Sequence, residues 1–105
     1  MSKSSINVLF VCGMGMGTST MAELGVKREL KPLKISAEVD HTSLGMMASR
    51  REWADIIVIL RNLFTEVVPQ EGEFFIPVVN VMASKDIAAQ INEIVVEHFP
   101  GAKES

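Results

Sequence analysis

Short apolar runs alternate along this chain with longer segments of helical periodicity, an order typical of βαβ units around a parallel sheet. We expect strands over Ile6–Cys12, Lys34–His41, Ala54–Arg61 and Phe74–Met82. The first and third runs are almost unbroken in hydrophobicity, which indicates central strands buried on both faces. The second alternates apolar and polar residues, as an edge strand does. Pro77 places the fourth at an outer position, because proline cannot donate to the ladder on that side.

The helical segments complete a three-layer α/β fold. One helix is expected from Thr18 or Ser19 to about Leu30, where Pro32 stops it. Ser84 is a plausible N-cap for the last helix, which carries an apolar stripe over Ile87, Ile91, Ile94, Val95 and His98. Right-handed crossovers then favour a four-stranded parallel sheet in the flavodoxin-like order 2-1-3-4, with helices on both faces. The last six residues, PGAKES, are expected to fray.

Composition limits the classes of function open to the chain. With 105 residues, 48% of them hydrophobic, we expect a single domain over residues 1–105. A net charge of -3 argues against a nucleic-acid or anionic membrane surface. One cysteine cannot form an internal disulfide, and two widely separated histidines do not supply a zinc site. The N-terminus lacks a signal peptide's cleavage site, and no apolar run approaches the roughly 20 residues of a membrane span. We therefore expect a cytoplasmic protein without a bound metal.

The segment CGMGMGTS, residues 12 to 19, has the composition of an anion-binding loop. Its three glycines let the backbone adopt positive φ and turn several N–H groups toward one point, just before a helix N-terminus. The positive end of that helix also favours the thiolate form of Cys12. A thiolate within a phosphate cradle can accept a phosphoryl group covalently. We predict Cys12 as the nucleophile and seven phosphate-binding residues: Gly13, Met14, Gly15, Met16, Gly17, Thr18 and Ser19.

Other loop motifs fail on particular residues. A Walker A loop requires lysine where Gly17 stands, and a dinucleotide fingerprint requires GxGxxG where this chain has GxGxG. A CxxC redox pair is excluded because Gly15 occupies the position of the second thiol. The plain alternative is that Cys12 is a buried residue at a strand end and the glycines only make a tight turn.

The stretch VLFVCGMGMGTSTMAE, from Val8 to Glu23, resembles the phosphorylation-site loop of the enzyme IIB components of the phosphoenolpyruvate-dependent sugar phosphotransferase system (PTS), closest to the galactitol and ascorbate group. The resemblance implies that Cys12 takes a phosphoryl group from a phosphohistidine of a IIA protein and passes it to a sugar entering through the membrane component IIC. It also implies a peripheral association with the inner membrane through IIC and no cofactor. A shuttle of this kind would be a monomer that forms transient complexes.

The loop is also similar to that of the low-molecular-weight tyrosine phosphatases, which carry C-x5-R-S. Here Thr18 takes the place of the arginine, and no Asp-Pro pair is present to supply a general acid. These absences favour phosphoryl relay over hydrolysis. Two alternatives stay open, a phosphatase-like hydrolase and a non-catalytic domain that binds a phosphorylated ligand.

Several polar residues follow the predicted strands and are weaker candidates. His41 could contact the phosphoryl group or the donor histidine, but a loop histidine without a role is the simpler interpretation, and the same holds for Thr42 and Ser43. Arg61 is a possible charge partner for phosphate, and Asn80 could line the same crevice. His98 is interpreted as a packing residue. Met14 and Met16 are flexible apolar side chains that would suit a surface contacting two partners.

Overall fold

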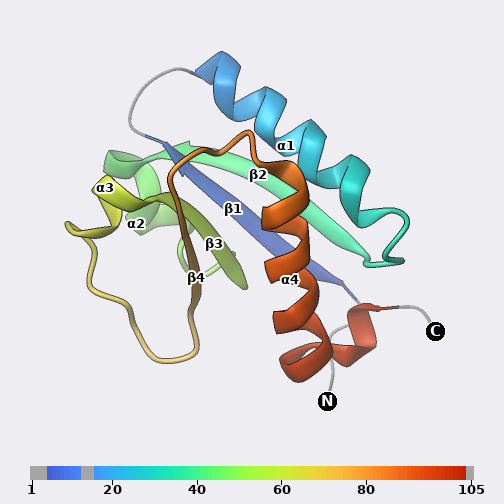
Figure 1. Cartoon of the computed structure of the whole chain (residues 1–105). Coiled ribbons are helices and arrows are strands. Elements are labelled where there is room, and N and C mark those ends of the chain that lie inside the picture. The colour runs from blue at the N-terminus through green and yellow to red at the C-terminus, as the bar shows by residue number, and fades with distance from the viewer. Residues whose placement is uncertain (1–4, 13–15, 104–105) are drawn as a thin grey trace.

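The computed structural model describes residues 5–12 and 16–103, without the side chains of Cys12 and of residues 16–20. Its centre is a parallel four-stranded sheet in the order β2-β1-β3-β4 (Figure 1). The strands are β1 (Ile6–Cys12), β2 (Ala37–Ser43), β3 (Ile56–Leu60) and β4 (Phe74–Val78). The predicted fold class and strand order are confirmed.

Two long helices cover one face of this sheet. They are α1 (Met16–Leu30) and α4 (Ser84–His98), which lie side by side in Figure 1. The alternate β1 residues Ile6, Val8 and Phe10 pack beneath them. Both helices contribute an apolar stripe to this larger core: Ala22, Val26 and Leu30 from α1, and Ile87, Ala88, Ile91 and Val95 from α4.

The other face has a smaller core under short helical turns. These are the 3-10 turn η1 (Leu44–Met46), α2 (Met47–Arg50) and α3 (Arg61–Phe64). Leu9 and Val11 of β1 point to this side and pack with Met47, Ile57 and Ile59. Helices on both faces were predicted, and the burial of both sides explains why β1 and β3 are almost continuously apolar.

Several predicted boundaries shift in the structure. β2 begins at Ala37 and not at Lys34, because residues 31–34 form a turn that closes α1, with Lys34 at a φ of 60°. α1 begins at Met16, two residues before the predicted start at Thr18. Ser84 is the first residue of α4, not its N-cap, and the cap position belongs to Ala83. β4 is an edge strand, as Pro77 indicated, but it ends at Val78 and not at Met82.

Residues 100–103 do not fray as predicted, and the last two residues of PGAKES lie outside the described residues. Pro100–Ala102 form a 3-10 turn (η2), and the side chain of Ala102 is buried in the larger core. The backbone N–H of Ser36 donates to the carbonyl of Ala102 at 2.8 Å, and Ile35 forms an antiparallel bridge with Lys103. Residues 102 and 103 are therefore held beside the segment that enters β2.

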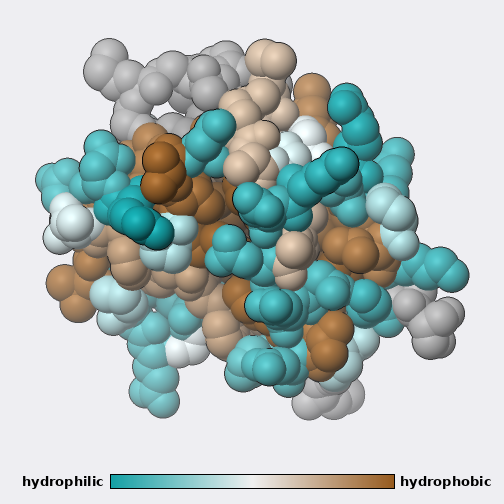
Figure 2. All heavy atoms as spheres, in the orientation of Figure 1, coloured by the Kyte–Doolittle hydropathy of each residue, from teal (hydrophilic) through white to brown (hydrophobic). Residues whose placement is uncertain are grey.

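The surface that carries α4 is mainly polar. In Figure 2, hydrophilic side chains cover much of this face, with apolar groups between them. Within residues 5–12 and 16–103, no helix combines the length and the apolar character that a membrane span requires.

Candidate functional site

The carboxyl ends of the four parallel strands define one edge of the sheet. Cys12 is the last residue of β1, and its register partner on β2 is Ser43, the last residue of that strand. On the other side of β1, β3 ends at Leu60. α1 begins at Met16, four residues after Cys12. The sequence prediction of a strand-end cysteine ahead of a helix N-terminus is thus confirmed for the backbone.

The predicted phosphate-binding residues divide into two groups. Gly13, Met14 and Gly15 lie outside the described residues. Met16, Gly17, Thr18 and Ser19 form the first four positions of α1. The first four N–H groups of a helix have no partner within the helix, and a helix of this length presents the positive end of its dipole there.

His41 was expected to end the second strand, but β2 continues beyond it to Ser43. It lies inside β2, opposite Phe10, and not in a loop past the strand end. Its side chain is 20% exposed, and its ring nitrogen Nδ1 lies 2.7 Å from Oε2 of Glu23 in α1. The interpretation as a loop histidine was therefore wrong, since His41 connects an edge strand to the helix that covers it.

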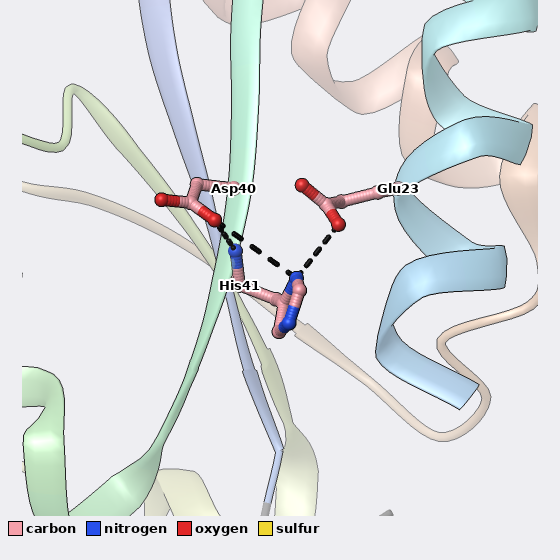
Figure 3. A group of neighbouring side chains, drawn as sticks. All are labelled: Glu23, Asp40 and His41. Carbon is pink, nitrogen blue, oxygen red and sulfur yellow. Dashed lines mark hydrogen bonds and ion pairs between the residues drawn. The ribbon is translucent and has the colours of Figure 1, made fainter. Parts of the chain in front are cut away.

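Glu23 and His41 belong to a longer polar chain across β2 (Figure 3). The backbone N–H of His41 donates to Oδ1 of Asp40 at 2.8 Å, and the other oxygen of Asp40 accepts from the guanidinium of Arg50. Arg50 in turn lies over the Trp53 ring, 4.8 Å from its centroid. Successive strand residues point to opposite faces, so this chain joins α1 on one side of the sheet to α2 on the other.

The same three side chains have the donor types of a metal site. One ligand atom each of Glu23, Asp40 and His41 lies within 4.8 Å of the others. A divalent cation would have to compete with Arg50 for Asp40 and with the Glu23–His41 hydrogen bond. These existing bonds explain the cluster without a metal.

Arg61 and Asn80 lie at the predicted edge of the sheet. Arg61 is the exposed first residue of α3, and with Asn62, Thr65, Val78 and Val79 it lines an open hollow of about 450 Å³. Asn80 lies two residues beyond the end of β4, where its Oδ1 accepts from the N–H of Met82 at 2.9 Å. That bond closes a turn, so the Asn80 side chain already has a local structural role.

The remaining candidates are two residues at the end of β2 and a histidine at the end of α4. Thr42 and Ser43 are half-buried residues at the end of β2. His98 ends α4, where its ring packs on Phe74 with the centroids 4.5 Å apart. The interpretation of His98 as a packing residue agrees with this contact.

Sequence reasoning missed Glu23 and the apolar residues around the edge. Glu23 ends the motif stretch, but nothing local indicates that its partner is a strand residue 18 positions away. Exposed Met46, Val79 and Met82 follow β2 and β4 at the carboxyl edge. Their signal in the sequence is apolar character within four residues of a strand end, and buried residues at the end of a strand have the same character.

Comparison with known proteins identifies the family. The family model described as "PTS system, Lactose/Cellobiose specific IIB subunit" matches residues 7–93. The chain belongs to this family. The expectation of a PTS IIB component, drawn from the loop, is confirmed.

Relatives of this IIB chain carry names of the ascorbate type. The "Ascorbate-specific PTS system EIIB component" of Escherichia coli O157:H7 is 27% identical over 96 residues, covering 91% of this chain and 95% of that protein. The protein of the same name from Mycoplasma pneumoniae is 27% identical over 95 residues, covering 90% and 100%. The predicted galactitol and ascorbate grouping is compatible with these names, while the family description names lactose and cellobiose.

Solved IIB structures share the fold. The lactose-specific IIB component domain from Streptococcus pneumoniae superposes with a TM-score of 0.62 at 16% identity, covering 90% of this chain and 98% of that one. The cellobiose-specific IIB component from Borrelia burgdorferi gives a TM-score of 0.55 at 17% identity, covering 96% and 97%. At these identities the likeness concerns the fold alone.

Proposed function

We propose that this IIB protein is a phosphocysteine carrier in which Cys12 accepts a phosphoryl group from a phosphohistidine of a IIA protein and passes it to a sugar entering through a membrane IIC component. The observation that carries the proposal is the position of Cys12. It ends the central strand β1, at the carboxyl edge where ligands of open α/β sheets bind, and α1 begins four residues later.

The transfer itself needs little covalent chemistry from the protein. As the Sγ–P bond forms, the N–P bond of the donor breaks and its electron pair stays on the donor imidazole. Catalysis then depends on holding the two nucleophiles in line and on balancing charge on the phosphoryl oxygens. N–H groups of the loop and of the first turn of α1 would supply that balance, together with the Thr18 and Ser19 hydroxyls.

Relay is favoured over hydrolysis by the residues of the loop. Thr18 stands where a phosphatase of similar loop spacing has its arginine, so the bidentate charged contact that would stabilise hydrolysis is missing. The isolated protein should consequently hold a phosphothiol and turn over a generic aryl phosphate only slowly.

Docking of two partners in turn is expected at the carboxyl edge. Exposed Met46, Val79 and Met82 follow β2 and β4 at the same carboxyl edge of the sheet as the end of β1, and exposed methionine suits surfaces that repack against different partners. A shuttle must leave its donor to reach its acceptor, so weak, brief complexes of a monomer on the cytoplasmic side of the membrane fit this role.

Phosphoryl labelling tests the proposal. The protein is incubated with phosphoenolpyruvate, the general phosphotransfer proteins and candidate IIA proteins, and the modified residue is located by mass spectrometry. We expect one phosphoryl group on Cys12 of the wild type and none on Cys12→Ser, with both proteins unfolding at similar temperatures. Label that persists in Cys12→Ser would assign the acceptor elsewhere. If no IIA labels the wild type, and phosphorylated ligands still bind to Cys12→Ser, the chain is an anion-binding domain.

A further inference from the structure

The Glu23–His41 pair lies close to the position of Cys12 in the sheet. His41 is the register partner of Phe10, two residues before the pairing of Cys12 with Ser43. Residues two apart on a strand share a face, so positions 10, 12, 41 and 43 all belong to the side covered by α1. With strands about 4.8 Å apart and a rise of about 3.3 Å per residue, the Cα atoms of His41 and Cys12 are separated by about 8 Å.

The hydrogen bond to Glu23 fixes the orientation of the imidazole. A carboxylate only accepts hydrogen bonds, so Nδ1 of His41 carries the hydrogen in the 2.7 Å contact. In a neutral ring this leaves the lone pair on Nε2. Figure 3 shows Nε2 on the side of the ring away from Glu23, toward the end of α1 at which the helix begins. A base whose other nitrogen is held by a carboxylate is the usual partner of an activated nucleophile.

We propose that His41 is the proton acceptor that keeps Cys12 in its thiolate form, and that Glu23 is the positioning residue that holds His41 in the required tautomer. This rests on the proposed function of Cys12. The thiol proton moves to Nε2, the thiolate attacks phosphorus, and the donor N–P bond breaks as described above. The imidazolium then remains beside the phosphoryl group, with Nδ1 bonded to Glu23.

Charges around His41 favour this role. Glu23 faces it from α1, and Oδ1 of Asp40 lies 3.9 Å from Nδ1 on the same strand. The guanidinium of Arg50, on α2, pairs with Asp40 and offsets much of that second negative charge. β1 contributes the apolar Phe10 at the register position. Glu23 is thus the charged group in direct contact with the His41 ring.

The chain contains a matched control pair. His98 and Glu97 are neighbours on α4, with Nε2 and Oε2 separated by 3.8 Å and side chains that are 48% and 75% exposed. The Glu23 and His41 side chains are 13% and 20% exposed, so their bond is much better shielded from water. Replacing each pair by glutamine changes the same chemical groups at two different sites.

Alkylation of the thiol tests the pair without any partner protein. The chain has one cysteine, so the rate constant for iodoacetamide reports only on Cys12. We expect His41→Gln to slow alkylation at pH 7 about tenfold and to move the midpoint of the pH–rate curve upward, because the thiolate fraction falls. Glu23→Gln should have a smaller effect in the same direction. His98→Gln and Glu97→Gln should react within twofold of the wild type.

The double variant shows whether Glu23 acts through His41 or independently of it. The double variant His41→Gln/Glu23→Gln should react no more slowly than His41→Gln alone, because Glu23 acts only through His41. Thermal unfolding of each variant is measured in parallel. An alkylation rate of folded His41→Gln within twofold of the wild type at every pH would overturn the proposal.

A measurement on the wild type guards against a variant that does not fold. With ¹⁵N-labelled histidine, blocking Cys12 with iodoacetamide should shift the Nε2 resonance of His41 and leave that of His98 in place. If the Nε2 resonances of His41 and His98 shift equally, or if neither shifts, the proposed role of His41 is refuted. If phosphoryl labelling fails while the alkylation and resonance effects are present, only the carrier function is overturned. If Cys12 is labelled but these effects are absent, only the proposed role of His41 and Glu23 is overturned.

Discussion

Arg51 and Glu73 form a two-point ion pair that fixes the loop between α3 and β4. Nε and Nη2 of Arg51 lie 2.9 and 2.6 Å from the two carboxylate oxygens of Glu73. Nη2 of Arg51 also donates to the Val68 carbonyl, and Glu73 accepts from the N–H of Gln70. The hydrogen bond from Arg51 lowers the pKa of Glu73, and the same bond raises the pKa of Arg51. The pair lies where β4 begins, at the edge opposite Cys12.

We predict that Glu73→Gln lowers the free energy of unfolding at pH 7 by about 1–3 kcal/mol, because Arg51 loses a charged partner. In the wild type, folding lowers the pKa of the Glu73 carboxyl. Such a group stabilises the folded protein at pH values above the ordinary carboxyl pKa of 4.5. That contribution is lost as the pH falls through the lower folded pKa. The difference between wild type and variant should therefore shrink as the pH falls from about 5 through the lowered pKa of Glu73.

Urea unfolding at several pH values measures this difference. Glu66→Gln, which changes an exposed carboxylate of the same loop, is the control and should unfold like the wild type throughout. A constant difference between Glu73→Gln and wild type at all pH values would show that the ion pair does not cause it.

At the scale of elements, α1 and α4 approach each other where α1 has no side chain. A Cβ added to Gly25 would lie 2.3 Å from Oγ and 3.3 Å from Cβ of Ser84, the first residue of α4. Glycine in a helix interior is unfavourable by about 1 kcal/mol relative to alanine. The close contact between the two helices explains why glycine occurs in the middle of α1.

We predict that Gly25→Ala destabilises the wild type by about 1–3 kcal/mol, because overpacking outweighs the gain in helix propensity. In a Ser84→Ala background the same change should have a smaller effect, since the nearest atom is gone. Chemical unfolding of the two single variants and the double variant measures the coupling.

Gly45→Ala is the control for the glycine substitution. An added Cβ at Gly45 meets nothing within 4 Å, so this variant should be close to neutral. Equal effects of Gly25→Ala in the two backgrounds would contradict the assigned contact.

At the scale of the whole molecule, the segment that enters β2 is held by the chain's last described residues. Ser36 donates to the Ala102 carbonyl, Ile35 bridges to Lys103, and Ala102 is buried against the core shared by α1 and α4. We predict that deleting residues 100–105 lowers the free energy of unfolding by about 1–2 kcal/mol. Deleting residues 104–105 alone should have no measurable effect. Equal stability of both truncations in urea would show that these contacts contribute nothing.

Much of the fold was predictable because it depends on local pattern. The unbroken apolar runs in β1 and β3 require burial on both faces, and Pro77 belongs on an edge. The predicted start of β2 was wrong, since a turn over residues 31–34 follows α1 and Ile35 pairs with Lys103, a residue 68 positions away. The prediction that residues 100–103 fray was wrong for a similar reason, because Ala102 and Lys103 contact residues that are distant in sequence.

The sequence alone determined the class of fold, the strand order and the family, because periodicity and a cysteine followed by three alternating glycines are properties of neighbouring residues. Only the tertiary structure decided what surrounds that cysteine. Glu23 and His41 are 18 residues apart, and no local rule pairs them. They meet because a parallel crossover lays α1 over the edge strand β2, and such long-range placement follows from packing of the whole chain.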